Sequence, residues 1–327
     1  MKQNKLNMSL LFMAGVTVLL FAPFIGPKFI SIGILSKDPS LKFIFTQLRI
    51  PRTILSFIAG GSLSLSGLIF QNLFKNKLAT PYTLGISSGA AAGALIAIKL
   101  NLFGSIFGFG FSYIAGFSGG LLSVLIIMAI LRITGSSSVY TILLSGVAIS
   151  FFFSAFILLI QYLVDMTQSI SAIRWLMGNL SVSGYKEILI LTPFFIIYIV
   201  IILLLQKELI LISGGDEFAV SRGMNVKKFR ISIFILVSLI TGMIVSVTGP
   251  IGFVGLIIPH IMRIFINNNY KLLIISSTFF GGVFLVLADI ISRTIISPAE
   301  IPVGIITSFF GAPFFIIILV SGIKSNK

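Results

Sequence analysis

Residues 140–163 read YTILLSGVAISFFFSAFILLIQYL. No charged side chain interrupts this run, and a helix needs about 20 such residues to cross the hydrocarbon core of a bilayer. Inside a bilayer the backbone must satisfy its own hydrogen bonds, which a helix does within a single segment. The run therefore predicts a transmembrane helix.

The rest of the chain has the same character. Of its 327 residues 57% are hydrophobic and 9% are charged, whereas a soluble domain carries about 25% charged residues. We therefore expect an all-α, polytopic integral membrane protein, formed as a single transmembrane domain over residues 1–327 with about ten helices. The predicted spans are 8–25, 53–73, 83–100, 111–131, 140–163, 188–206, 231–248, 251–267, 272–291 and 303–323.

The distribution of basic residues predicts the topology. An even number of spans puts both termini on one side, and Lys2 and Lys5 favour the cytoplasm. Of the 23 Lys and Arg residues, 14 then lie inside and 9 outside, with the excess mainly in residues 207–230. Residues 26–52 and 164–187 become long external connections, and residues 207–230 suit short surface helices that face a soluble partner.

Two other interpretations of the charged residues are less favoured. Lys2 and Lys5 precede an apolar run as in a signal peptide, but no small-residue cleavage site follows, so we expect a retained first helix. The net charge of +15 does not indicate nucleic acid binding, because the basic residues are scattered between apolar runs.

Small residues are spaced for close helix packing. Gly85, Gly89 and Gly93 recur every four residues, and Gly60 and Ser64 have the same spacing. Such positions let helix backbones approach each other in lipid. We expect packing here, with a direct role in a substrate path as the alternative.

The sequence contains no enzyme motif and no cysteine, and His260 is the single histidine. Asp289 and Arg293 are four residues apart, which predicts an ion pair on one helical face. A secondary transporter would keep more ionisable groups within its spans. An ion-coupled carrier using Asp289, Arg293 and His260 stays as an alternative, and a membrane enzyme would need a polar cluster that the sequence lacks.

Several short motifs follow one another in order from about residue 45 to the C-terminus. They are RIPR at 49–52, GLIFQ at 67–71, NKLATP at 76–81, LGISSGA at 84–90, WLMGNL at 175–180, GPIGFVGL at 249–256, PH at 259–260, EIPVG at 300–304 and GAPFF at 311–315. Together they resemble the FecCD-type permeases of ABC importers for iron-siderophores, haem, cobalamin and related chelates.

The resemblance implies a type II ABC importer permease fold of ten helices in the bacterial or archaeal cytoplasmic (inner) membrane. Two permease subunits, in a homodimer or pseudo-dimer, would form the pore. ATP-binding-cassette ATPase subunits would bind on the cytoplasmic side, and a periplasmic or lipid-anchored substrate-binding protein would dock outside. The resemblance implies that this chain is not an enzyme and binds no cofactor, because the partner ATPase binds ATP and Mg and hydrolyses ATP.

The resemblance also assigns residues. Arg49, Arg52 and Arg293 match arginines that meet glutamates of the binding protein, and the charge distribution also places them outside. Such charges steer docking and set its register. The alternative is that these arginines only extend toward the membrane interface.

Residues 207–230 resemble the coupling helices of the family, which sit in a groove of the ATPase. The matching residues are Gly215, Asp216, Glu217, Ala219 and Gly223. An ordinary positive-inside linker is the alternative.

The cytoplasmic gate and pathway are expected where two turns match the family. Lys77 stands where the family usually has a proline, which changes the gate turn. The expected residues are Asn76, Leu78, Val139, Tyr140, Gly249, Pro250 and Gly252.

Overall fold

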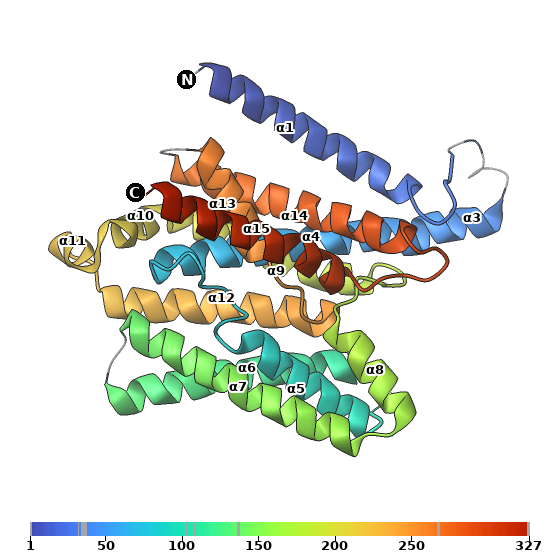
Figure 1. Ribbon diagram of the computed structural model, residues 1–327, viewed down its shortest axis with the longest axis horizontal. Helices are drawn as coiled ribbons and strands as arrows, with labels where there is room; N and C mark the ends of the chain where they lie inside the picture. Colours follow the sequence, from blue (N-terminus) through green and yellow to red (C-terminus); the bar gives the residue numbers. More distant parts are fainter. Residues whose placement is uncertain are drawn as a thin grey trace. The chain divides into compact units, whose positions relative to one another are not determined.

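The computed structural model describes residues 2–31, 33, 38–102, 104–106, 109–135, 138–266 and 269–325. The described chain is almost entirely helical, and each of the ten predicted spans contains a helix (Figure 1). Two strands of two residues, β1 (Ser105–Ile106) and β2 (Phe109–Gly110), pair antiparallel. The predicted all-α class is confirmed. Lys37 and Lys327, which entered the topology prediction, lie outside the described residues.

The elements follow one another along the chain with short connections. They are α1 (Lys2–Phe21), η1 (Ala22–Phe24), α3 (Pro39–Phe43), the π-helical turn η2 (Ile44–Arg49), α4 (Ile50–Leu73), α5 (Ile86–Lys99), α6 (Phe111–Thr134), α7 (Val139–Leu163), α8 (Met166–Leu176), α9 (Lys186–Leu204), α10 (Gln206–Gly214), α11 (Asp216–Ser221), α12 (Val226–Thr248), α13 (Val254–Phe265), α14 (Tyr270–Thr294) and α15 (Val303–Ser325).

Six helical stretches of the described chain are long and apolar enough to cross a membrane: Pro39–Leu73, Phe111–Thr134, Val139–Leu163, Lys186–Leu204, Val226–Thr248 and Tyr270–Thr294. The first runs through α3, η2 and α4 for 35 residues. At 1.5 Å per residue such a stretch is about 50 Å long, whereas the hydrocarbon core is about 30 Å thick. It must therefore tilt strongly or project beyond the bilayer. Four shorter apolar helices complete the ten predicted segments.

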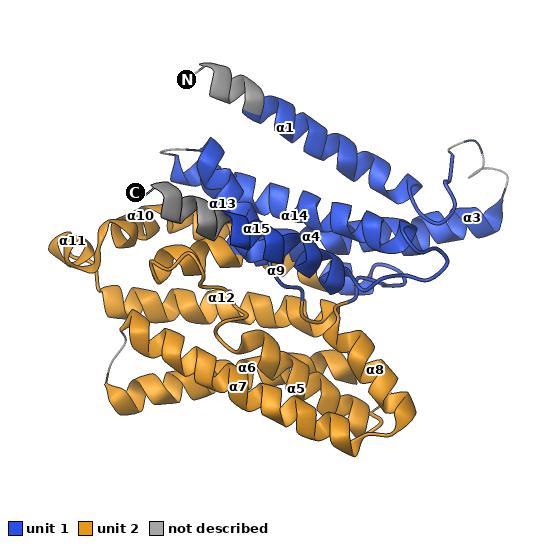
Figure 2. Cartoon of the chain, viewed as in Figure 1, with its two compact units in different colours: residues 1–65, 179–189, 251–327 blue, residues 66–178, 190–250 orange. Residues whose placement is uncertain are grey.

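The chain forms two compact units (Figure 2). Unit 1 comprises residues 1–65, 179–189 and 251–327. Within it, α4 and α14 touch backbone to backbone, since a Cβ added at Gly60 would lie 2.2 Å from the Gly281 carbonyl oxygen. Ser64 Oγ donates to the Ser277 carbonyl oxygen at 2.7 Å, one turn further along α4. The small residues of α4 therefore serve helix packing.

Unit 2 comprises residues 66–178 and 190–250. Here α5 packs on α6 along the predicted glycine stripe. A Cβ at Gly93 would lie 2.0 Å from the Ala115 carbonyl oxygen, and one at Gly89 would lie 2.5 Å from that of Gly119. The packing role that the four-residue spacing predicts is confirmed. Because each unit is assembled from separated segments, neither is a consecutive domain, and the single-domain organisation stays a prediction.

Two of the predicted connections, 164–187 and 207–230, contain helices, and only those of 207–230 were predicted. The connection 164–187, which is predicted to be external, holds α8, and α8 begins with a capping box between Asp165 and Gln168. In the 207–230 connection, the expected short helices are α10 and α11. The following helix, α12, begins five residues before its predicted start, because Asn225 Oδ1 caps it by accepting from the Lys228 amide at 3.0 Å.

The GPIGFVGL motif forms a backbone break before α13. The predicted span begins at residue 251, but the helix begins at Val254. Gly249 has φ +66°, and a Cβ there would lie 2.4 Å from the Trp175 carbonyl oxygen, so glycine is required. Phe253 also has a left-handed φ of +67°. These two conformations delay the start of the helix.

Candidate functional site

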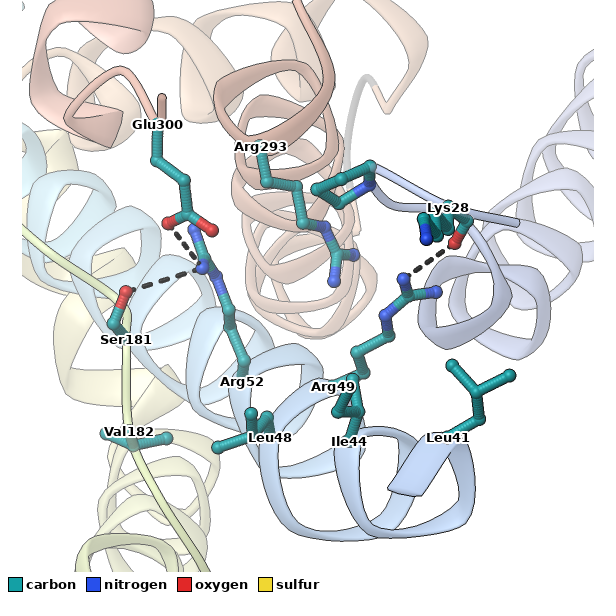
Figure 3. A pocket seen from close by; sticks show the side chains of 11 residues that line it. Lys28, Leu41, Ile44, Leu48, Arg49, Arg52, Ser181, Val182, Arg293 and Glu300 are labelled. Carbon is teal, nitrogen blue, oxygen red and sulfur yellow. Dashed lines mark hydrogen bonds and ion pairs between the residues drawn. The ribbon is translucent and has the colours of Figure 1, made fainter. Parts of the chain in front are cut away.

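An arginine cluster gathers the three predicted docking arginines in unit 1 (Figure 3). Arg49 ends η2, Arg52 lies in the first turn of α4, and Arg293 lies in the last turn of α14. They line a cavity of about 570 Å³. Their exposed fractions are 8%, 9% and 3%, so their charges are largely removed from solvent.

Arg52 is the most fully paired of the three. Its Nε donates to Asp289 Oδ1 at 2.7 Å, and its Nη1 donates to Glu300 Oε2 at 2.7 Å and to Ser181 Oγ at 3.3 Å. Asp289 is completely buried, whereas the Glu300 side chain is 42% exposed. A buried arginine is tolerated when carboxylates and hydroxyls surround it in this way.

Arg293 shares Asp289 with Arg52. Its Nε lies 3.5 Å from Asp289 Oδ2, which confirms the ion pair predicted from their spacing of four residues. Its Nη2 also donates to the Ala22 carbonyl oxygen at 3.0 Å. One buried carboxylate therefore holds two arginines that come from different helices.

Arg49 is bound by backbone alone. Nη1 donates to the carbonyl oxygens of Pro23 and Phe24 at 3.3 and 3.1 Å, and Nη2 donates to that of Lys28 at 2.7 Å. A Cβ at Gly26 would lie 2.7 Å from Nη2, so the absence of a side chain at this position lets the guanidinium lie against the segment in this geometry. Among the described residues no carboxylate pairs with Arg49. Three arginines and two carboxylates leave the cluster with one excess positive charge, which we assign to Arg49.

The sequence did not identify every residue of the cluster. Glu300 was recognised within its motif, but its pairing with Arg52 was not predicted, and neither were Ser181 and Gly26. Residues 52 and 300 are 248 positions apart, and no local pattern reports such a contact. Glycine at position 26, in an otherwise apolar stretch, is the one signal that could have indicated a close approach.

The predicted coupling residues form a second structured region, in unit 2. Asp216 accepts from Arg230 Nη2 with both oxygens, at 2.9 and 2.7 Å, and from Lys75 Nζ at 3.3 Å. Lys75 follows α4 and Arg230 lies in the second turn of α12. Asn72 Nδ2 also donates to the Leu209 carbonyl oxygen at 2.9 Å. The α10–α11 segment (residues 206–221) is therefore tied to the end of α4 and the start of α12.

The other predicted coupling residues shape this segment. Gly215 has φ +129° and Gly223 has φ +80°, conformations that favour glycine before and after α11. Ala219 is fully buried and fixes the inner face of α11. Glu217 is exposed, and Phe218 beside it is 45% exposed.

The ion pairs determine the titration of Asp216. Partial burial raises the pKa of its carboxyl, but the hydrogen bond and charge of Arg230, together with Lys75, lower it by more. The pKa therefore lies below the ordinary value of an aspartate, and the carboxylate stays charged at neutral pH.

The predicted gate residues fall in separate places. The Leu78 amide donates to Asn76 Oδ1 at 2.9 Å in a tight turn, and Leu78 is 44% exposed. Val139 and Tyr140 begin α7, and Tyr140 is 74% exposed. Lys77, which lies between Asn76 and Leu78 in the turn, is exposed.

The predicted pathway residues Gly249, Pro250 and Gly252 lie in the break before α13. A Cβ at Gly252 would meet no atom within 4 Å, so this position is open rather than packed. The gate and pathway roles of these residues, like the docking and coupling roles above, stay predictions.

A model of the FecCD transport family matches residues 9–321. The chain belongs to the FecCD transport family. All residues of the arginine cluster and of the α10–α11 segment lie inside the matched region. The family resemblance read from the motifs is thereby confirmed.

Relatives of this FecCD family member cover most of its length. The uncharacterised ABC transporter permease protein YvrB of Bacillus subtilis is 40% identical over 89% of this chain and 82% of its own. The hemin transport system permease protein HmuU of Yersinia pestis is 32% identical over 86% of this chain and 84% of its own. A solved metal-chelate type ABC transporter in an inward-facing conformation has a TM-score of 0.84 at 29% identity, covering 95% of this chain and 97% of that one.

Proposed function

We propose that this chain is the transmembrane permease subunit of an ATP-binding-cassette importer that moves an iron chelate, haem or cobalamin across the cytoplasmic membrane. It would span the bilayer ten times with both termini inside, and it would pair with a second copy of itself. ATP would be hydrolysed in partner ATPase subunits, and a substrate-binding protein would deliver the chelate. The family match and the names of the relatives support the permease role and the class of cargo.

The α10–α11 segment is the observation that carries the proposal. A polar connection at the end of apolar helices would normally expose polar groups, yet Phe218 and Val220 of α11 are 45% and 60% exposed. Arg222 lies over the Phe218 ring, with its Cζ 5.4 Å from the ring centre. Exposed aromatic and arginine groups on a short rigid element suit a groove in a protein partner.

The contacts of Asp216 support a mechanical role for this surface. A partner that displaces α11 pulls on Asp216, and Asp216 is bonded to Lys75 and Arg230. The force then reaches the end of α4 and the start of α12, next to the predicted gate turn at Asn76. Rigid elements joined by ion pairs can pass a domain movement to a pore in this way.

Co-purification of the ATPase tests the coupling surface. Phe218→Ser should reduce the amount of ATPase that co-purifies with the full chain, because it removes the exposed ring but leaves the Asp216 contacts. Tyr162→Ser is the control. Tyr162 lies near the C-terminal end of α7, outside the α10–α11 segment, and is 87% exposed. If the wild-type protein, Phe218→Ser and Tyr162→Ser all recover the same amount of ATPase, residues 207–230 are an ordinary linker.

The arginine cluster refines the docking proposal to one residue. Arg52 and Arg293 already pair with Asp289, whereas Arg49 carries the charge that no described carboxylate balances. Arg49 is therefore the group we expect to attract a carboxylate of the binding protein. Its charge would steer the encounter more than it would add affinity.

An Arg49→Gln variant tests this assignment. It keeps hydrogen-bond donors for the carbonyl groups but removes the charge, so stimulation of the ATPase by the binding protein should fall and lose its dependence on salt. Arg174→Gln is the matched control, because Arg174 is exposed on α8 and is also predicted to lie outside. Full stimulation of the Arg49→Gln protein would instead indicate a purely structural arginine.

The ion-coupled carrier receives no support from the residues it would use. Asp289 is held by two arginines, and His260 packs edge-on to Phe314 with ring centres 6.3 Å apart. The relatives are ABC transport permeases.

A further inference from the structure

We propose that a cavity between the end of α6 and the start of α12 binds an anionic phospholipid, with the headgroup phosphate at Arg132 and Lys227. The cavity has a volume of about 640 Å³ and lies within unit 2. Both helices belong to this unit and pack against each other (Figures 1 and 2). Its apolar wall and its basic rim come from different parts of the sequence, and the proposal follows from how they meet.

The wall of the cavity is one face of α6. Leu125, Met128, Ala129 and Arg132 are spaced by three and four residues, so they line the same side of the helix. From residue 125 to residue 132 this face is about 10 Å long. Leu125 is 56% exposed, so the apolar part of the face is uncovered in the chain. The apolar face of α6 therefore ends at the guanidinium of Arg132.

The second basic group comes from α12. Lys227 lies in the first turn of this helix, and its Nζ donates to the Gly135 carbonyl oxygen at 3.3 Å. The contact holds the ammonium next to the last turn of α6, which contains Arg132. An ammonium has three donors, so Lys227 keeps two for a ligand.

No carboxylate balances this rim. All eight Asp and Glu residues of the chain are described, and none of them lines the cavity or forms an ion pair with Arg132 or Lys227. Asp216, an acidic residue of the same unit, is engaged by Arg230 and Lys75. The cavity therefore presents two positive charges that an anion would compensate.

The position of the cavity selects a lipid over other anions. Both α6 and α12 are long and apolar enough to cross a membrane, so their ends lie at the depth of the headgroups. A basic pocket between two such helices matches a phosphate headgroup, and the apolar face of α6 matches the first part of an acyl chain. Free phosphate would satisfy the rim but leave the apolar wall exposed to water.

Native mass spectrometry of the delipidated full chain tests the proposal, with phosphatidylglycerol and phosphatidylcholine as the two probes. The wild-type protein should retain phosphatidylglycerol about tenfold more strongly than phosphatidylcholine. The double variant R132Q/K227Q should lose this preference. Lys228→Gln is the matched control, because it removes one charge from the same turn of α12 at an exposed position that does not line the cavity.

A second variant tests the apolar wall without changing any charge. Ala129 is an exposed residue of the wall, and Ala129→Trp should fill the cavity and reduce phosphatidylglycerol retention severalfold. Inorganic phosphate at millimolar concentration should not displace the lipid. The proposal would be overturned by an equal loss in K228Q, which indicates diffuse charge attraction, by unchanged binding in A129W, or by displacement with phosphate.

Discussion

At the scale of single residues, Asp289 determines the arginine cluster. It pairs with Arg52 at 2.7 Å and with Arg293 at 3.5 Å, and it is fully buried. The Arg293 pair could be predicted because four residues make one helical turn. The Arg52 pair could not, because Arg52 and Asp289 are 237 positions apart and no local pattern reports their contact.

Replacing Asp289 should unfold the cluster. Asp289→Asn leaves the buried guanidinium of Arg293 without a carboxylate and leaves Arg52 with Glu300 alone. Breaking a buried ion pair in this way costs about 3–5 kcal/mol. The apparent midpoint of thermal unfolding in detergent should fall clearly. Glu300→Gln removes a partner of Arg52 whose side chain is 42% exposed and should cost about 1 kcal/mol or less. Similar midpoints for the two variants would contradict the central role of Asp289.

The lowered pKa of Asp216 predicts how α11 responds to pH. A carboxylate with a depressed pKa contributes stability above its ordinary pKa of about 3.9 and loses it as the pH falls through the lowered value. Hydrogen exchange of the α11 amides, corrected for the intrinsic rate, should therefore be constant from pH 8 to pH 5 and rise below about pH 4.

The Asp216→Asn variant supplies the control for this measurement. It should show fast exchange in α11 at every pH, because the charge that binds Arg230 and Lys75 is gone. If the wild-type protein shows the same protection at pH 3 as at pH 7, the ion pairs do not hold α11.

At the scale of elements, apolar length and small-residue spacing were sufficient to predict the ten helical segments and the packing of α5 on α6. All ten predicted segments contain helices, and the glycine stripe of α5 packs as expected. The helix α8 was missed because its sequence is too polar and short for a span, although its capping box between Asp165 and Gln168 is visible in the sequence. The start of α13 was placed too early because apolar residues continue through a backbone break.

Two glycines of unit 2 give a sharp test of the packing. Gly93→Ala would place a Cβ 2.0 Å from the Ala115 carbonyl oxygen, so α5 and α6 must separate, which costs about 1–3 kcal/mol. Gly120→Ala on α6 places its Cβ in ordinary contact, with the nearest atom at 3.5 Å. Alanine favours helix over glycine, so G120A should be neutral or stabilising. Equal midpoints of thermal unfolding for G93A and G120A would contradict the close packing of α5 on α6.

At the scale of the whole molecule, composition predicted a membrane protein, and the ordered motifs predicted the family that the comparison shows. The contacts that organise the candidate sites were beyond prediction, because Arg52, Asp216 and their partners come from distant segments. One helix, α4, carries Arg52 near its start and Asn72 near its end, so a single element contributes to both regions.

Uptake into proteoliposomes tests the central claim most directly. The full chain would be reconstituted with its ATPase and binding protein, and the accumulation of labelled ferric siderophore, haem and cobalamin would be measured with and without ATP. The account predicts that one of these chelates accumulates only when ATP and the binding protein are both present, and that Asp216→Asn reduces this uptake severalfold. Accumulation driven by an ion gradient without ATP would contradict it.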